Sequence, residues 1–423
     1  MSLNSNTLSV LHINQTDRLG GAGRSANRIH HSLRQLGVRS RMLVSRKTTH
    51  DKDIREISQS VLRVLDRSAY HLFERLSLQY LFYPSSFLLL YDKWFRESDV
   101  IQLFNTHDNY FAHTALPFIS RKKPVVWRLS DMWAMTGHCT HALDCERWMS
   151  GCGSCPYLSG YPALRWDTTA FLWRAKKSVY ARSRINIVAP SKWIANLARC
   201  SPLLNRFTIH HIPNGTDISV FSPTGKSEAR RLIGIDTTKT IILFSSHLIN
   251  DPLKGKVFVE QAIDRVANGP WSDQVLLLVV GREAKEWRES RLETIRLEHI
   301  TDDRALAKVY SAADIFILPT LADTSPNSVL ESMACETPVV TFDVGGCPDL
   351  VQHMQNGYLA RYKDALDFTN GITTLLSDAT LRKELGKAAL ETVLRNFTSE
   401  QEGRRFRSLY EELVRETKTL PKE

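Results

Sequence analysis

Short apolar runs alternate with helical patterns along the whole chain of 423 residues. The runs are unbroken stretches of Val, Ile and Leu, which is typical of parallel strands whose sheet is covered on both faces. Segments with helical spacing lie between them, so the pattern predicts an α/β architecture with parallel sheets. The predicted strands cover residues 8–13, 40–45, 99–104, 124–129 and 185–190 in the first half, and residues 240–245, 274–281, 314–319 and 337–343 in the second.

The two groups of strands predict two Rossmann-like domains, and the length suits two domains of about 200 residues. Turn-forming residues gather at 210–223, so we expect domains at 1–210 and 211–423. Residues 378–416 show helical spacing and predict two C-terminal helices. We expect the last helix to pack back on the first domain. Ligands of such sheets bind beyond the carboxyl ends of the strands, so the loops after the strands are the candidate sites.

The composition is that of a water-soluble globular protein, with 43% hydrophobic and 24% charged residues. The longest apolar runs, at 85–91 and 275–280, are far shorter than the ~20 residues of a membrane-spanning helix. The N-terminus lacks the basic start and long apolar core of a signal peptide. We therefore expect a cytoplasmic protein.

The positive charge lies in the first half of the chain. Residues 1–200 carry 28 Lys and Arg against 14 Asp and Glu, whereas residues 201–423 carry 27 against 31. A basic half indicates an anionic partner, such as an anionic membrane surface or a phosphate-bearing substrate. The sequence has no zinc finger, RNP motif or long basic run, so we expect no nucleic-acid partner. Residues 61–100 mix basic, aromatic and Leu side chains, and they suit either a helix on a bilayer surface or one packed on its own domain.

Two glycine-containing loops follow predicted strands. Gly21 and Gly23 belong to the stretch GGAG, ahead of a helix that we expect to begin near Ser25. Its N-terminal amides could hold an anion, or the glycines could serve turn geometry alone. Lys254 precedes Gly255 in the second half, where the lysine could neutralise a diphosphate or be a solvated side chain beside a turn.

The stretch DTSPNSVLE places two acids eight residues apart, Asp323 in a polar loop and Glu331 in the helix that follows. If this helix begins near Asn327 or Ser328, Glu331 lies in its first turn, where a carboxylate is favoured by the helix dipole. The alternative is a substrate site, because a carboxylate can accept hydrogen bonds from two ribose hydroxyls.

The ordered motifs GGAG, IPNGTD, KG, acid-x7-acid, TPVV and NGYLA resemble the retaining GT-B glycosyltransferases of family 4, particularly the bacterial exopolysaccharide and colanic-acid branch. The resemblance spans roughly residues 8–415. It implies an α/β GT-B fold with two Rossmann-like domains facing across a cleft and C-terminal helices. The first domain would bind the acceptor and the second a UDP- or GDP-linked sugar.

The resemblance also implies roles for the residues of the two loops. Glu331 would bind the donor ribose, Asp323 would contact the transferred sugar, and Lys254 would offset the charge of the leaving diphosphate. Asp323, Glu331 and Lys254 are thus the candidate catalytic residues. The further donor-binding candidates are Ser325, Pro326 and Asn327 along the sugar and diphosphate, and Gly21 and Gly23 beside the donor phosphates.

This sequence departs from the family pattern at three positions. Asp323 is shorter by one methylene than the usual Glu, and no arginine stands upstream of Lys254. Ser130 replaces a histidine often found in the acceptor site, which leaves Asp131 and His138 as the acceptor-side candidates. The substitution is compatible with activity, since in retaining enzymes the leaving phosphate oxygen can accept the proton of the acceptor.

Four of the seven cysteines fall in the loop 139–155 with the spacing C-x5-C-x6-C-x2-C. In a cytoplasmic chain such clustering favours a structural zinc site, with reduced packing thiols and redox chemistry as the alternatives. Four thiolates would leave no open coordination position, so this zinc would not be catalytic. The candidate ligands are Cys139, Cys145, Cys152 and Cys155.

The sequence thus predicts a retaining hexosyltransferase of surface polysaccharide biosynthesis, acting on a glycan or a lipid-diphosphate-linked acceptor. No cofactor is required for catalysis if Lys254 and loop dipoles carry the phosphate charge. The basic first half suits a peripheral position on the inner face of the cell membrane. The alternatives are a GT-B epimerase or phosphorylase, and a non-catalytic protein that binds nucleotide sugars or polyanions.

Overall fold

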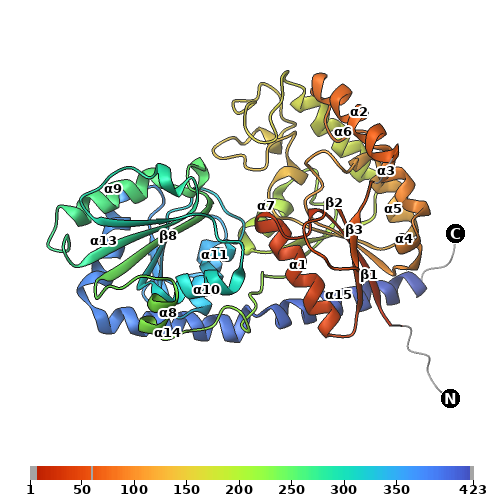
Figure 1. The fold of residues 1–423 in the computed structure, drawn as a ribbon. Helices are drawn as coiled ribbons and strands as arrows, with labels where there is room; N and C mark the ends of the chain where they lie inside the picture. Colours follow the sequence, from red (N-terminus) through yellow and green to blue (C-terminus); the bar gives the residue numbers. More distant parts are fainter. Residues whose placement is uncertain (1–6, 59–60, 420–423) are drawn as a thin grey trace, which may run out of the picture. The chain divides into compact units, whose positions relative to one another are not determined.

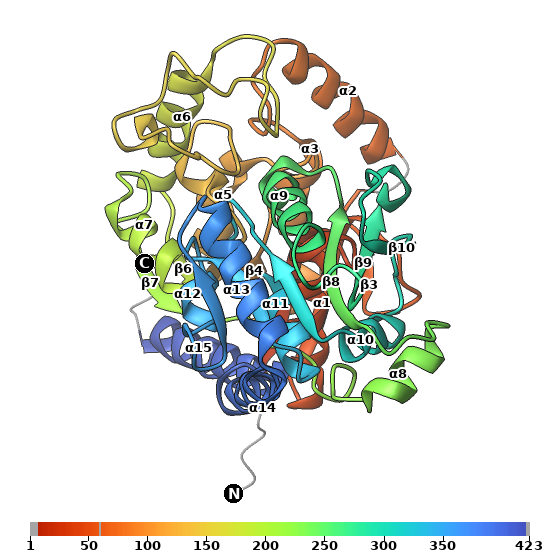
Figure 2. The ribbon, with the colours of Figure 1, turned by 90° about the vertical axis from the view of Figure 1, so that its left-hand side faces the viewer.

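The computed structural model describes residues 7–58 and 61–419. The chain divides into two compact units, Met1–Pro213 with Glu402–Glu423, and Asn214–Gln401. Each unit is a parallel sheet with helices on both faces (Figures 1 and 2). The predicted α/β fold with two Rossmann-like sheets is therefore confirmed. No helix among the described residues combines the length and apolar character that a membrane crossing requires.

The first unit contains a seven-stranded sheet in the order β3-β2-β1-β4-β5-β6-β7, and every neighbouring pair is parallel. All five strands predicted in this half are present. The short strands β3 and β7 were not predicted, because neither is a buried apolar run. The strands are β1 (Ser9–Thr16), β2 (Arg39–Arg46), β3 (Ile54–Glu56), β4 (Val100–Leu103), β5 (Val125–Arg128), β6 (Ile185–Ala189) and β7 (Thr208–His211).

Two hydrophobic cores form in this unit, and their members show which helices pack together. One core joins β1 to α1 and α15, through residues such as Val10, Leu33 and Phe406. The other joins the sheet to α5, α6 and α7. The helices are α1 (Gly20–Gln35), α2 (Val61–Arg75), α3 (Pro84–Leu88), α4 (Lys93–Glu97), α5 (Leu116–Lys122), α6 (Thr169–Ala181), α7 (Lys192–Cys200) and α15 (Ser399–Thr419).

Helix α15 belongs to the first unit although it ends the described chain. The hydroxyl of Tyr410 donates a hydrogen bond of 2.9 Å to Oε1 of Gln102 on β4. Gly403 lies against α1 so closely that a Cβ atom there would be 2.1 Å from the Oγ atom of Ser32. Both predicted C-terminal helices are present, α14 (Ala379–Asn396) in the second unit and α15 in the first.

The second unit contains a six-stranded parallel sheet in the order β10-β9-β8-β11-β12-β13. The four predicted strands are present, and one hydrophobic core surrounds them. The strands are β8 (Thr240–Leu248), β9 (Val275–Arg282), β10 (Glu293–Leu297), β11 (Ile315–Leu318), β12 (Val339–Phe342) and β13 (Gly357–Ala360). The remaining helices are α8 (Lys226–Leu232), α9 (Lys256–Ala267), α10 (Asp303–Ala312), α11 (Asn327–Ala334), α12 (Cys347–Leu350) and α13 (Ala365–Ser377).

Each sheet has one point at which the chain reverses the direction in which it adds strands. In the first unit this point lies between β1 and β4, and in the second between β8 and β11. The loops that follow the two strands diverge there, which leaves room for a ligand at the carboxyl edge of the sheet. The strand orders therefore single out the loops after β1, β4, β8 and β11.

We predict that Phe406→Ala lowers the free energy of unfolding of the first unit by about 3–5 kcal/mol, because it empties a buried site between α15 and the sheet. Urea unfolding measures the change. The control is Ser408→Ala on the exposed side of the same helix, which we expect to have little effect. Equal stability of the two variants would show that α15 contributes no core packing.

Candidate functional site

Lys254 and Asp323 form an ion pair at the switch point of the second sheet. Lys254 follows β8 and Asp323 follows β11, and the lysine Nζ atom lies 2.9 Å from Oδ2 of Asp323. Burial lowers the pKa of Lys254, but the charge of Asp323 and their hydrogen bond outweigh it, so the pKa lies above its usual value. Lys254 is therefore a fixed cation at neutral pH.

The loop of Lys254 is attached to the loop after β11 by backbone contacts. The carbonyl of Leu253 accepts hydrogen bonds from the Thr320 hydroxyl, at 2.9 Å, and from the Leu321 amide, at 2.7 Å. Gly255 has a positive φ of 71°, and a Cβ atom there would lie 1.9 Å from the Pro319 carbonyl oxygen. Only glycine permits this approach, which places Lys254 beside Asp323.

The loop of Asp323 is also held from the neighbouring strand. The Asp323 carbonyl accepts a hydrogen bond of 3.0 Å from the Gly346 amide, in the loop that follows β12. Gly345 has a φ of 60°, and a Cβ atom there would lie 2.2 Å from that carbonyl oxygen. Oδ1 of Asp323 accepts the Ser325 amide at 3.2 Å. The carboxylate is thus positioned by three consecutive loops of the carboxyl edge.

Ser325, Pro326 and Asn327 lead from Asp323 into α11, whose first residue is Asn327. The side chain of Asn214 donates hydrogen bonds of 3.2 Å to the Ser325 carbonyl and to Oδ1 of Asn327. The Ser325 hydroxyl is buried and has no hydrogen-bond partner among the described residues. A buried hydroxyl without a partner is costly, so this atom is suited to a ligand. Asn214 was not among the predicted site residues, although it belongs to the quoted motif IPNGTD.

Glu331 is the fifth residue of α11, so the expectation that it lies in the first turn is wrong. The helix begins at Asn327, as one of the two expected starts had it, but its first turn contains no acidic residue. The Glu331 side chain is 1% exposed, and the Tyr310 hydroxyl on α10 donates to its Oε2 atom at 3.5 Å. Glu331 therefore lies beyond the first turn of α11, and one of its contacts is with α10. Lys254 and Asp323, in contrast, are in direct contact with each other.

Gly21 and Gly23 lie inside α1, which begins at Gly20 and not near Ser25. Gly23 is buried, and a Cβ atom there would be 2.6 Å from the Thr16 hydroxyl at the end of β1. Gly23 therefore lets the helix start close to the strand. The first turn contains no acidic residue, and Leu19 at the N-cap position has no polar side-chain atom with which to cap the helix. This helix N-terminus at the switch point is suited to an anion.

Asp131 is paired with His107, a residue that the sequence analysis did not identify. Nε2 of His107, after β4, lies 2.8 Å from Oδ2 of Asp131, after β5. Burial raises the pKa of Asp131, but its charge interaction and hydrogen bond with His107 outweigh this effect, so the pKa is lowered. The available signal was the polar stretch 105–109 directly after a predicted strand.

His138 is buried and makes its contacts with the loop 139–163. Its Nδ1 atom lies 2.9 Å from the Pro162 carbonyl oxygen, and its Nε2 atom lies 3.3 Å from Sγ of Cys155. The ring is thus in contact with a cysteine, whereas Asp131 is in contact with His107. Of the two acceptor-side candidates, Asp131 is the one that adjoins the loop after β4.

The four cysteines of the loop are partly buried and reduced. Sγ of Cys152 accepts a hydrogen bond of 3.2 Å from the Gly137 amide. Among the described residues, the one group of three potential metal ligands whose atoms all lie within 4.8 Å of one another is His30, His31 and Asp51. The four thiols are therefore not gathered into a compact ligand set, although all four sulfurs are chemically suited to zinc.

Lys176 of α6 anchors the segment that precedes the cysteines. Its buried Nζ atom donates to the carbonyls of Trp133, at 2.6 Å, and Thr136, at 3.0 Å. It also lies 3.4 Å from the centre of the Trp133 ring. Burial lowers the pKa of Lys176 to about 7. One lysine of α6 thus fixes the loop after β5 through two hydrogen bonds and a ring contact.

Two family descriptions match this chain. Glycosyl transferases group 1 matches residues 239–378, and Glycosyltransferase Family 4 matches residues 19–220. Together they cover most of both units. They include the loops after β4, β8 and β11 that the strand orders single out, and the family 4 match begins at Leu19, directly before α1.

The similar curated proteins are glycosyltransferases and related synthases. The D-inositol 3-phosphate glycosyltransferase of Stackebrandtia nassauensis is 27% identical over 224 residues, which are 50% of this chain and 49% of that protein. The N-acetyl-alpha-D-glucosaminyl L-malate synthase of Bacillus anthracis is 23% identical over 219 residues, 50% of this chain and 55% of that protein. The chain thus spans about half the length of the curated relatives that it matches.

Solved structures share the fold over nearly the whole chain. Anabaena Alr3699/HepE in complex with UDP-glucose has a TM-score of 0.65 at 17% identity, with 96% of this chain and 100% of that chain covered. Sucrose-phosphate synthase from Thermosynechococcus elongatus has a TM-score of 0.65 at 17% identity, with 97% and 100% covered. The chain is thus similar to these two glycosyltransferase families over most of both units, and the shared architecture shows that its fold is an α/β GT-B fold.

Proposed function

We propose that the protein is a retaining hexosyltransferase, which moves a sugar from a UDP- or GDP-linked donor to a glycan or lipid-diphosphate-linked acceptor in surface polysaccharide biosynthesis. The nucleotide-sugar donor is supported by the Anabaena structures, which hold UDP and UDP-glucose. The anionic acceptor is supported by the excess of Lys and Arg in residues 1–200.

The observation that carries this proposal is the ion pair of Lys254 and Asp323 at the switch point. A cation held there neutralises the donor diphosphate and stabilises the charge that develops as the phosphate leaves. Its carboxylate partner would accept hydrogen bonds from hydroxyls of the transferred sugar. The pair also suits the shorter acid, because Lys254 and two loop hydrogen bonds hold Asp323 in place without the extra methylene.

Retention follows if the acceptor hydroxyl attacks from the face that the diphosphate leaves. The bond between the anomeric carbon and the phosphate oxygen breaks, and the bond to the acceptor oxygen forms on the same face. The leaving phosphate oxygen takes the acceptor proton, so no enzymic base is needed. Asp131 and His107 of the first unit would then bind the acceptor. The Ser325 hydroxyl and Asn327 would contact the donor.

A panel of nucleotide sugars tests the proposed activity, since slow hydrolysis of the donor needs no known acceptor. We expect slow hydrolysis of one UDP- or GDP-linked hexose. An added acceptor should raise the rate at which the donor is consumed, and the transferred sugar should keep the anomeric configuration of the donor. Binding of nucleotide sugars without hydrolysis or transfer would contradict the proposal and favour a binding protein. Conversion without any acceptor to an isomeric nucleotide sugar would favour an epimerase.

We predict that Lys254→Met lowers kcat for donor turnover by about 10²- to 10³-fold, because the developing phosphate charge loses its cation. The matched control is Lys256→Met, two residues later at the start of α9, where the lysine contacts Asn250 and Glu260 instead. Steady-state kinetics on both variants measures the effect. Equal rates in the two variants would remove Lys254 from the mechanism.

We predict that Glu331→Ala weakens binding of the free nucleotide by about 10- to 100-fold, because the ribose loses hydrogen bonds to a charged acceptor. Glu331→Gln keeps the shape of the buried side chain and separates the loss of charge from a packing defect. Calorimetry with UDP and GDP measures the affinity, and Glu336→Gln, outside α11, is the control. Wild-type affinity for the nucleotide in both Glu331 variants would show that Glu331 does not bind the ribose.

We also propose that Cys139, Cys145, Cys152 and Cys155 hold a structural zinc ion. Support comes from their spacing, from their shared loop and from the thiolate preference of zinc. Because the four thiols do not form a compact set in this structure, their sulfur atoms would move together when zinc binds. The ion would fix the loop that follows β5, near Asp131, and would take no part in catalysis.

We predict about one zinc per chain by elemental analysis of protein purified without chelator, since four thiolates complete one tetrahedral site. Cys152→Ser should remove the metal, whereas Cys200→Ser, on the exposed end of α7, should retain it. A folded, metal-free wild-type sample would falsify the zinc site.

A further inference from the structure

Helix α2 presents an apolar face to the solvent. Leu65, Leu72 and Leu76 follow one another at helical spacing, and their side chains are 48%, 58% and 51% exposed. The neighbouring Val64 is 64% exposed, whereas Asp66 is buried. In a helix packed on its own domain the exposure is reversed, with Leu inside and Asp outside. The face is therefore not explained by packing of the first unit.

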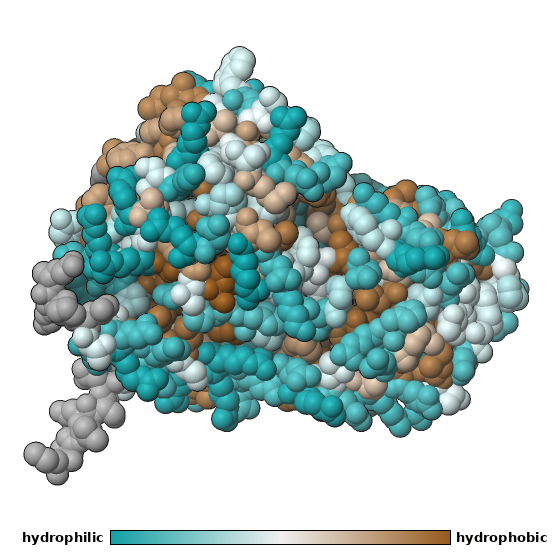
Figure 3. Space-filling view, turned by 180° about the vertical axis from the view of Figure 1, so that it is seen from behind, coloured by the Kyte–Doolittle hydropathy of each residue, from teal (hydrophilic) through white to brown (hydrophobic). Residues whose placement is uncertain are grey.

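This face continues across neighbouring elements as one surface. Ring contacts link Phe73 of α2 to Phe82, Phe82 to Phe87 of α3, and Phe87 to Phe118 of α5. Phe82, Phe118 and the intervening Leu88 are each exposed by more than two fifths. Figure 3 shows apolar atoms gathered at the upper left, over the end of this unit that carries α2. A contiguous apolar surface of this kind marks an interaction site.

Basic side chains border the surface where α5 ends. Phe118 shares one face of α5 with Arg121 and Lys122, which stand three and four residues later and are exposed. On α2, Arg67 and Arg75 are likewise exposed. Apolar side chains with flanking Arg and Lys are the composition of a surface that lies in a membrane interface.

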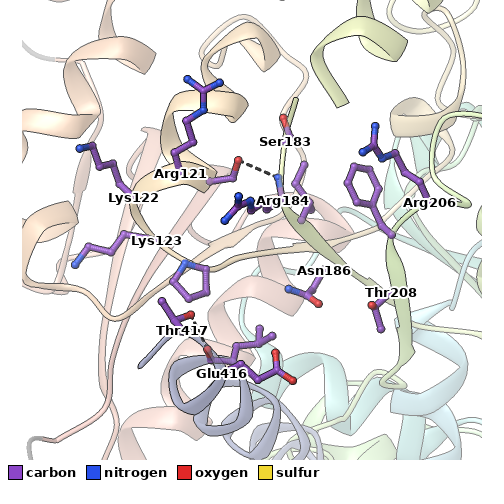
Figure 4. A pocket seen from close by; sticks show the side chains of 15 residues that line it. Arg121, Lys122, Lys123, Ser183, Arg184, Asn186, Arg206, Thr208, Glu416 and Thr417 are labelled. Atoms are coloured by element: carbon purple, nitrogen blue, oxygen red, sulfur yellow. Dashed lines mark hydrogen bonds between the residues drawn. The ribbon is translucent and has the colours of Figure 1, made fainter. Parts of the chain in front are cut away.

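Beyond α5 the basic border becomes a pocket of about 370 Å³. Five of its lining side chains are Arg or Lys, and one, Glu416, is acidic. Arg121, Lys122 and Lys123 lie on one side of the pocket and Arg206 on the other (Figure 4). It opens at the amino-terminal ends of β5, β6 and β7, the opposite edge from the loops of the candidate site. It is therefore separate from the binding groups of the first unit described above.

We propose that the surface formed by α2, α3 and α5, with its basic border, docks this protein on a bilayer that contains anionic phospholipid. The Leu and Phe side chains enter the boundary between head groups and acyl chains, and the basic residues meet the lipid phosphates. The basic side chains beside the exposed Leu and Phe residues favour an anionic lipid surface, because both the apolar layer and the phosphates of a bilayer then have matching groups. The proposal goes beyond the glycosyl transfer and does not depend on it.

Co-sedimentation with vesicles tests the docking surface. We expect the wild-type protein to pellet with phosphatidylcholine vesicles that contain phosphatidylglycerol, and to be released by high salt. Leu65→Glu with Leu72→Glu should lower the bound fraction about tenfold, because two charges replace inserted side chains. Arg121→Glu with Lys122→Glu should lower binding to the anionic vesicles by a similar factor.

Matched controls lie in the second unit. Leu366→Glu changes a Leu that is 55% exposed, and Lys383→Glu with Lys387→Glu reverses two exposed charges of α14; neither should alter sedimentation. Circular dichroism and thermal unfolding in vesicle-free solution check that each variant is folded. A wild-type protein that stays in the supernatant, or a Leu65/Leu72 variant that pellets like the wild type, would overturn the proposal. So would a concentration-dependent dimer that the Leu variants dissociate while vesicles have no effect.

Discussion

The ion pair of Lys254 and Asp323 depends on the order of the strands in the second sheet. The two residues are 69 positions apart, and they meet because β8 and β11 are parallel neighbours from which the chain departs in opposite directions. Close backbone approaches at Gly255 and Gly345 then fix the two loops. A cation and a carboxylate held in this way at the carboxyl edge suit the sugar diphosphate that we propose as the ligand, because little reorganisation would be needed when charge moves to the phosphate.

The parts of the fold that the sequence predicts are those with strong local patterns. Buried parallel strands are continuous apolar runs, and all nine that we predicted are present, with boundaries within three residues. The four missed strands, β3, β7, β10 and β13, are short or partly exposed and lack such runs. The helical period at the C-terminus predicts α14 and α15 for the same reason.

Side-chain partners depend on tertiary contacts, which local patterns do not contain. His107 pairs with Asp131 because β4 and β5 are neighbours, and this adjacency is a property of the sheet order. The start of α1 at Gly20 follows from the close approach of Gly23 to Thr16. The two loops with Lys254 and Asp323 were candidates from the sequence because their motifs occur in order along the chain, but the burial of Glu331 beside Tyr310 was not predicted.

If the donor diphosphate binds at the switch point of the second sheet, a crystal structure with UDP or GDP bound will show it there. We expect diphosphate density within hydrogen-bond distance of the Lys254 ammonium group and near the amides at the start of α11. A diphosphate bound elsewhere on the protein, with Lys254 and Asp323 still paired only to each other, would contradict this expectation.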